Sequence, residues 1–195
     1  MMNDGREKWN QGNFPFYFVQ LASFTAGGNS NEGCGWAELQ EAQTMTLSLP
    51  NTGMVVTTDL ATNPRDIHPR NKQDVGKRLA SLALNNVYQK PMVCSGPMYK
   101  SMEINGNQVV VSFNDIGNGL VTPDKYGYVK GFEIAGEDQI FYFAKAFIKD
   151  SNVILSCDDV PKPTAVHFSW VGDATESNLL NKEGFPAVPF RTDEW

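Results

Sequence analysis

Asp66 and His68 have the residue types and the spacing of a general base and the carboxylate that orients it. They stand in the stretch 66–71, between an apolar segment and an amphipathic one, which predicts a loop. An aspartate two residues before a histidine can accept a hydrogen bond from the imidazole Nδ1–H, which selects the tautomer and leaves Nε2 free to take a proton. Pro69 restricts the backbone of His68. The alternative is an exposed loop histidine, with Asp66 only turning the chain.

The other histidine, His167, falls in the alternating segment 165–170, on the face opposite Val166 and Phe168. This pattern predicts a strand residue whose ring is hydrogen-bonded or exposed rather than functional. Ser23 and Ser30 lie in or beside a Gly/Asn-rich loop that follows an apolar strand. A self-sufficient hydrolase would need one of these serines within hydrogen-bond reach of His68.

The composition suits an ordinary globular protein and excludes several other classes. The 195 residues are enough for one domain or two small ones, with 41% hydrophobic and 19% charged residues. The net charge of −6 and the lack of a basic block argue against a nucleic-acid partner. No apolar run approaches the roughly 18 residues that a membrane helix needs. No cofactor or metal motif is visible, and Cys34, Cys94 and Cys157 are expected to be free thiols, or one pair with one left over.

The elements expected before Pro91 alternate between helix and strand. A short helix over 2–11 has Trp9 on its apolar side, and near-continuous apolar runs predict buried parallel strands at 16–22 and 54–58. A helix over 36–47 turns an apolar face of Trp36, Leu39, Ala42 and Met45 inward, with Trp36 as a core or lid residue. A second helix, capped by Asn71 or Asp74, buries Val75, Leu79, Leu82 and Ala83 and points Gln73, Lys77 and Arg78 away.

Beyond Pro91 the apolar period changes from helical to alternating. Residues 102–113 predict a hairpin with a type I′ turn at Asn105-Gly106, and 132–134, 140–148, 153–157 and 165–170 predict further strands. Short strands at regular spacing are typical of a β-sandwich.

The stretch DIHPRNKQDVGKRL at 66–79 resembles the last conserved block of the SGNH/GDSL esterase superfamily, and more narrowly of the sialate O-acetylesterase family. In that family the aspartate and the histidine of this block complete a Ser-His-Asp triad, and by position they match Asp66 and His68. Other stretches resemble the same family, in register over nearly the whole chain: FPFYFVQLASF at 14–24, WAELQEAQ at 36–43, LPNTGMVVTTDL at 49–60, SGPMYKSM at 95–102, GFEIAGED at 131–138 and NKEGFPAVPFRTDEW at 181–195.

The resemblance implies an α/β fold class: the C-terminal half of an SGNH (flavodoxin-like) hydrolase sheet over 1–91, then a β-sandwich domain with an irregular tail over 92–195. The family removes O-acetyl groups from sialic acid or related sugars, without a cofactor, and is often secreted or periplasmic. Its nucleophilic serine lies in a G-x-S-N-like block, and two later blocks supply a glycine and an asparagine to the oxyanion hole. Ser30, in GGNSN, takes the place of a surface loop of the family and is not expected to be the nucleophile. Gln40 stands where the family usually has an arginine, which bears on substrate binding.

Three readings of function remain open at this point. The first is the His/Asp-bearing, C-terminal part of an esterase, inactive alone, whose serine lies in a separate or missing N-terminal half. The second is a carbohydrate-binding or structural β-sandwich module. The third is a complete hydrolase that uses Ser23 or Ser30. The polar N-terminal stretch MMNDGREKWNQG is not a signal peptide, and the sequence does not identify the compartment or the sugar.

Overall fold

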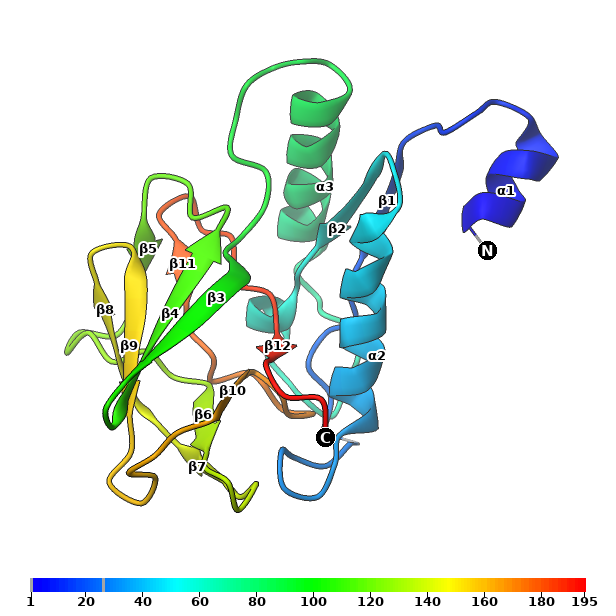
Figure 1. The fold of residues 1–195 in the computed structure, drawn as a ribbon. Coiled ribbons are helices and arrows are strands. Elements are labelled where there is room, and N and C mark those ends of the chain that lie inside the picture. The colour runs from blue at the N-terminus through cyan, green and yellow to red at the C-terminus, as the bar shows by residue number, and fades with distance from the viewer. Residues whose placement is uncertain (1, 26) are drawn as a thin grey trace.

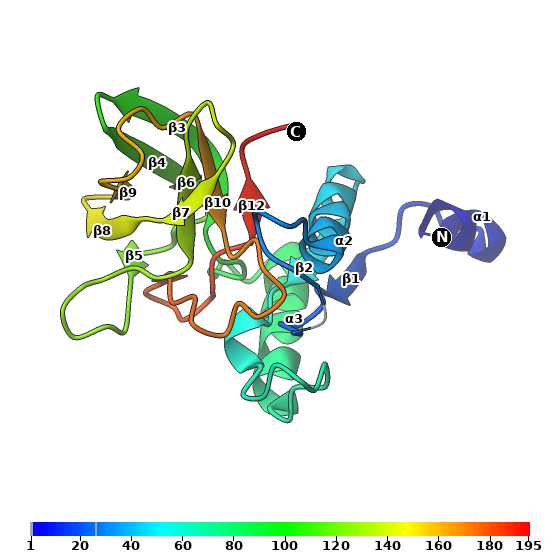
Figure 2. The ribbon, with the colours of Figure 1, turned by 90° about the horizontal axis from the view of Figure 1, so that it is seen from below.

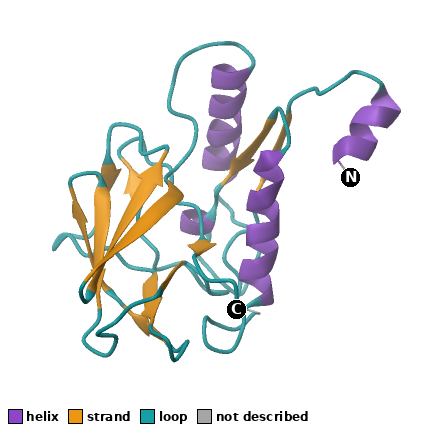
Figure 3. Cartoon of the chain, in the orientation of Figure 1, coloured by secondary structure: helices purple, strands orange, loops and turns teal. Residues whose placement is uncertain are grey.

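The computed structural model describes residues 2–25 and 27–195 and has a mixed α/β fold, as predicted, with few helices and several small sheets (Figures 1 and 3). The helices are α1 (Met2–Trp9), α2 (Gly35–Met45) and α3 (Lys72–Asn86), with short 3₁₀ turns η1 (Thr46–Ser48) and η2 (Thr58–Leu60). The strands are β1 (Phe16–Val19), β2 (Thr52–Val55), β3 (Met98–Asn105), β4 (Gln108–Asn114), β5 (Leu120–Val121), β6 (Phe132–Ala135), β7 (Phe141–Phe143), β8 (Lys145–Lys149), β9 (Asn152–Ser156), β10 (Ala165–Phe168), β11 (Leu180–Asn181) and β12 (Phe190–Arg191).

The first part of the chain has a two-stranded parallel sheet between two helices. β1 pairs with β2 from Phe16 opposite Thr52 to Val19 opposite Val55, and α2 and α3 lie on opposite faces of the pair (Figure 2). The predicted strand at 16–22 ends earlier, and β1 is half-buried rather than covered on both faces. The reason is that among residues 2–25 and 27–195 only β2 pairs with β1, so its other edge has no neighbouring strand.

The predicted apolar face of α2 is wrong. Leu39 and Met45 are 48% and 69% exposed, while Ala37 and Gln40 are buried. Gln40 faces the sheet because its Nε2 donates to Leu21 O (2.8 Å), and Gln43 Oε1 accepts from Leu21 N (3.0 Å). Backbone groups beyond the end of β1 need partners, so a polar helix face is the one that packs there.

Two arginines are buried where the sequence predicted otherwise. In α1, Trp9 is exposed and Arg6 is buried, because Arg6 Nη2 donates to the carbonyls of Phe14 and Pro50, each at 2.8 Å. In α3, Arg78 was expected to point away from the core. It is buried instead, since its guanidinium forms a bidentate ion pair with the Asp59 carboxylate (2.8 and 2.6 Å) and donates to Val56 O and Gly184 O.

The second part of the chain contains two four-stranded antiparallel sheets, in the orders β3-β4-β9-β8 and β12-β10-β6-β7. One apolar cluster takes Val111 and Leu155 from the first sheet and Phe132 and Val166 from the second, so the two sheets share a core. The small sheet β11-β5 lies beside them.

Two details of the β-rich part differ from prediction. The expected strand at 140–148 is split at Ala144, where the chain leaves β7 in one sheet and enters β8 in the other. The hairpin turn is Gly106-Asn107, since Asn105 pairs with Gln108. Gly106 has φ +65° at the first turn position, whereas Asn107 at the second does not have a positive φ, which fits type II′ rather than type I′.

Candidate functional site

The Asp66 carboxylate lies against His68, as predicted. His68 Nδ1 is 3.0 Å from Asp66 Oδ1, and the same oxygen accepts from the backbone N–H of His68 (3.0 Å). The backbone hydrogen bond, followed by the imidazole contact, lowers the pKa of Asp66. The imidazole is 78% exposed, and in the described part of the chain no group is hydrogen-bonded to Nε2. This arrangement leaves one ring nitrogen open to act on a bound group.

Three contacts position the loop that carries this pair after β2. The Asp59–Arg78 ion pair ties its beginning to α3. At the end of the loop, Asn71 caps the N-terminus of α3, where its side chain accepts from Asp74 N (3.1 Å), as the sequence indicated. Between them, Pro64 O accepts from the backbone N–H of Thr25 at 2.8 Å, which links the loop after β1 to the loop after β2. The pair therefore lies where two neighbouring parallel strands end.

A depression of about 290 Å³ beside His68 contains no serine. Its lining residues are Thr62, Asn63, Asp66, His68, Pro69 and Arg70. Ser23 is fully buried, and Ser30 is hydrogen-bonded elsewhere. Within residues 2–25 and 27–195, no side-chain hydroxyl is hydrogen-bonded to His68. The structure thus places the Asp66 carboxylate against the His68 imidazole, with no hydroxyl of residues 2–25 and 27–195 hydrogen-bonded to that ring.

A serine–histidine–aspartate cluster centred on His167 was not predicted from the sequence. Its Nδ1 is 2.8 Å from Ser30 Oγ, and its Nε2 is 2.6 Å from Asp193 Oδ1. Ser30 Oγ also lies 2.5 Å from Glu133 Oε2 and 3.3 Å from Trp170 O. The side chains of His167 and Asp193 are only 3% and 2% exposed. His167 is therefore a hydrogen-bonded strand residue, as predicted, and Ser30 is hydrogen-bonded to it rather than standing free in a surface loop.

This cluster joins the loop after β1 to the second sheet. The side-chain amide of Asn31 makes the two hydrogen bonds that a neighbouring strand would make to the backbone of Phe141: it accepts from Phe141 N (2.7 Å) and donates to Phe141 O (3.0 Å). Nearby, Arg191 pairs with both carboxylate oxygens of Glu41 on α2, at 3.1 and 3.2 Å. The sequence contained these residues only as Ser30 in GGNSN and Asp193 in the tail RTDEW. They lie 137 and 26 residues from His167, so no local pattern indicated that the three meet.

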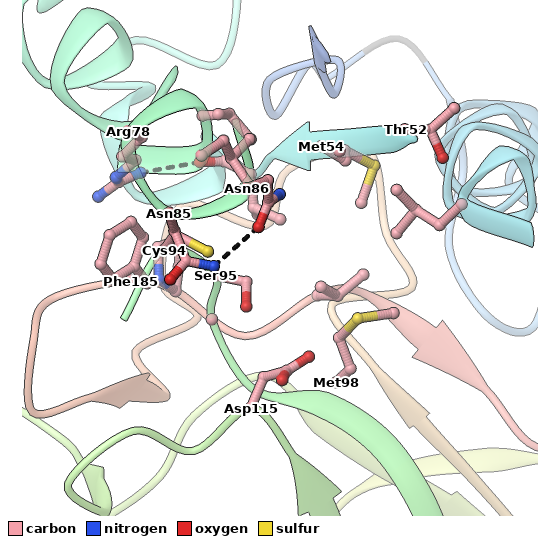
Figure 4. A pocket seen from close by; sticks show the side chains of 18 residues that line it. Thr52, Met54, Arg78, Asn85, Asn86, Cys94, Ser95, Met98, Asp115 and Phe185 are labelled. Carbon is pink, nitrogen blue, oxygen red and sulfur yellow. Dashed lines mark hydrogen bonds between the residues drawn. The ribbon is translucent and has the colours of Figure 1, made fainter. Parts of the chain in front are cut away.

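A separate cleft of about 360 Å³ lies between β2, α3 and the β-rich part (Figure 4). Asn85, Cys94, Ser95, Met98, Asp115 and Phe185 line it together with Arg78, whose guanidinium already pairs with Asp59. Burial raises the pKa of Asp115 and, together with the Asp115 charge, that of Cys94. Both histidines lie elsewhere, so the residues that line the cleft include no imidazole beside its thiol or hydroxyl.

Gln40, where an arginine was expected, is buried against the backbone and does not face the His68 depression. Cys34, Cys94 and Cys157 are free thiols. Across residues 2–25 and 27–195, no grouping of histidine, cysteine and acidic residues could hold a metal ion. None of the helices described is long and apolar enough to span a membrane.

Known proteins to which this chain is similar include three that are named as acetylesterases. The chain is 32% identical over 121 residues to sialate O-acetylesterase of Mus musculus, and 36% identical over 101 residues to that of Rattus norvegicus. These matches cover 53% and 47% of this chain but only 22% and 18% of the relatives. No protein-family model matches the chain.

A carbohydrate acetylesterase from Xanthomonas citri matches 100% of this chain, with a TM-score of 0.92 and 42% identity. The match covers 45% of that protein's chain, so this sequence spans less than half of it. The predicted resemblance to sialate O-acetylesterases is confirmed, and the similar proteins are esterases.

Proposed function

We propose that this chain supplies the general base and its orienting carboxylate, His68 and Asp66, to a carbohydrate O-acetylesterase that works by a Ser-His-Asp mechanism. The observation that carries the proposal is the 3.0 Å contact between His68 Nδ1 and Asp66 Oδ1, in a loop that follows a parallel strand. The serine and the oxyanion donors come from a part of the protein outside this sequence. The substrate is an O-acetylated sugar, sialic acid or a relative.

The chemistry follows from the roles of the two ring nitrogens. With Nδ1–H bonded to Asp66, the His68 Nε2 takes the proton of the attacking serine hydroxyl and returns it to the departing sugar oxygen. The Asp66 carboxylate stabilises the imidazolium that forms between these steps. Backbone and side-chain donors to the oxyanion provide a large share of such catalysis. A chain that lacks both the serine and these donors is expected to be inactive by itself.

The arrangement of the elements supports this assignment. β1 and β2 form a parallel pair with helices on both faces, which is how a flavodoxin-like sheet is built, and one edge of β1 has no strand in the described chain. The shared core of the two later sheets is what a β-sandwich requires. Residues 1–91 are accordingly the C-terminal part of an SGNH-type domain, and 92–195 are a β-sandwich.

The test is an esterase assay with p-nitrophenyl acetate and an O-acetylated sialic acid. The chain alone is compared with the chain joined to the preceding segment of the Xanthomonas acetylesterase, whose matching part is 42% identical. Activity is expected only in the joined protein, with His68→Ala abolishing it and Ser30→Ala reducing it far less. Activity of the chain alone that both substitutions abolish would refute the proposal and make Ser30 the nucleophile.

A second candidate, a sugar-binding surface without catalysis, is favoured by exposed aromatic side chains on the β-rich part. Tyr128 and Phe147 are 47% and 41% exposed, with ring centroids 4.8 Å apart. Exposed aromatic faces can stack on the C–H face of a sugar ring. Titration with a methyl sialoside, followed by NMR, would reveal such binding. Tyr128→Ala should then abolish it, whereas Phe143→Ala, on the other sheet, should not.

A further inference from the structure

The cluster around Ser30 contains more hydrogen-bond acceptors than its serine can satisfy. Glu133 and His167 are directly opposite each other on β6 and β10, and Ser30 Oγ lies between them, 2.5 Å from Glu133 Oε2 and 2.8 Å from His167 Nδ1. The Ser30 hydroxyl has one proton. If Glu133 were ionised and His167 neutral with its proton on Nε2 toward Asp193, two acceptors would compete for that proton. One additional proton must therefore reside in the row, on Glu133, on His167 or on Asp193.

The surroundings favour Glu133 as its site. Burial raises the pKa of Glu133, and burial lowers the pKa of His167 although Asp193 opposes that change. The ring of Phe141 stacks on the imidazole with centroids 3.7 Å apart, which keeps water away from it. The remaining charges around the imidazole are Arg191 on β12 and Glu41 on α2, and these two pair with each other.

We infer that Glu133 is a neutral carboxylic acid that donates to Ser30 Oγ, and that this proton latches the loop of residues 27–34 onto the β-rich part of the molecule. In this arrangement Glu133 donates to Ser30, Ser30 donates to His167 Nδ1, and His167 Nε2–H donates to Asp193. In this row Ser30 Oγ accepts one hydrogen bond and donates one, and removal of the Glu133 proton leaves two acceptors facing one hydroxyl.

The pH dependence of the latch follows from counting protons in the docked and the released loop. Docking raises the pKa of Glu133, so this group makes docking weaken as the pH rises from the ordinary Glu value of 4.5 through the raised value. Docking lowers the pKa of His167, so this group makes docking strengthen as the pH rises from the lowered value to the ordinary His value of 6.5. Above 6.5 the contribution of His167 no longer changes, and docking weakens until the pH has passed the raised pKa of Glu133.

The latch also reaches the loop that carries Asp66 and His68. Asn31 holds the docked loop on Phe141, and Thr25, at the start of the same loop, donates to Pro64 O at 2.8 Å. Release of residues 27–34 is therefore expected to loosen the loop that carries Asp66 and His68. This last step rests on the proposed function for its consequence in catalysis, whereas the latch itself does not.

The experiment measures hydrogen exchange of the Phe141 amide, which donates to Asn31 Oδ1, in the full chain. Above pH 6.5, where the contribution of His167 no longer changes, its protection, corrected for intrinsic exchange, is expected to fall by up to about tenfold per pH unit until the pH has passed the raised pKa of Glu133. The Val153 amide in the core of β9 is the control and should not follow this pattern.

Two substitutions decide the assignment. Glu133→Gln keeps a neutral donor beside Ser30, so protection of Phe141 should persist and its fall above pH 6.5 should disappear. Ser30→Ala should remove most of the protection at every pH. With only two histidines in the chain, imidazole ¹⁵N spectra compared with His68→Ala identify His167 and should show the neutral Nε2–H form. Loss of protection in Glu133→Gln, or a charged His167 near neutral pH, would overturn the latch. None of these measurements depends on esterase activity, so failure of the latch and of the proposed function are distinguishable.

Discussion

Single residues decide the chemistry of the His68 site. Asp66 accepts from both the backbone and the ring of His68, and its lowered pKa keeps it ionised. Because a lowered carboxyl pKa favours the ionised form, the contact is complete above the ordinary pKa of 3.8 and is lost as the pH falls through the lowered value. The carboxylate is therefore available to orient the imidazole throughout the neutral range.

Asp66→Asn is expected to reduce the kcat of the joined esterase by on the order of 10⁴, because an amide can hold the imidazole in the wrong tautomer. KM should change little, since the carboxylate acts through His68 rather than on the sugar. Steady-state kinetics with p-nitrophenyl acetate measure both constants. Asp74→Asn, at the start of α3, is the matched control and should leave kcat nearly unchanged. Equal losses in the two variants would contradict the orienting role.

Arg78 contributes to stability rather than to chemistry. Arg78→Met is expected to lower the free energy of unfolding by about 3 kcal/mol, because it leaves the partly buried Asp59 and two backbone carbonyls without their donor. Urea denaturation measures the change. Lys77→Met, on the exposed side of the same helix, should have almost no effect. If the two variants melted alike, the ion pair would not hold the loop to α3.

At the scale of elements, α2 shows that hydrogen bonds can override apolar periodicity. Its buried face presents Gln40 and Gln43 to the backbone beyond β1, and its apolar face lies outside. Gln40→Leu is expected to cost about 1–3 kcal/mol, because the buried Leu21 carbonyl loses its donor. Leu39→Gln should be nearly neutral. Thermal or urea unfolding of the two variants checks the order, and the reverse order would restore the apolar face predicted from periodicity.

At the scale of the whole molecule, large apolar side chains lie uncovered on α1, β1 and α2. Trp9 is 70% exposed, and Val19, Leu39 and Met45 are also exposed, while β1 pairs with β2 alone among the residues that the structure describes. Surfaces of this kind drive association. We expect the isolated chain to self-associate reversibly, with an average mass that rises with concentration in analytical ultracentrifugation. Leu39→Gln combined with Met45→Gln should reduce this association, and a monomer at all concentrations would refute the prediction.

Contacts between near neighbours in the chain were determined by the sequence itself. The Asp66–His68 contact spans two residues and the Asn71 cap spans three, so local geometry was sufficient to predict both. The order of the longer helices and strands followed from the periodicity of apolar residues, as did the parallel pair before Pro91 and the alternating strands after it, but β5 was not predicted, and β11 and β12 lie in the tail that was expected to be irregular. The family resemblance was likewise visible in the order of short stretches along the chain.

Only the tertiary structure decided which polar side chains are buried. Ser30 and His167 are 137 residues apart, and the partners of Arg78 and Gln40 are backbone carbonyls of other elements, to which apolar periodicity gives no clue. The periodicity of a helix indicates which residues share a face, but the face that packs is the one whose polar groups find partners on the neighbouring element. Tertiary structure also decided that the predicted strand at 140–148 is interrupted at Ala144, because the segments on either side of this residue pair in different sheets.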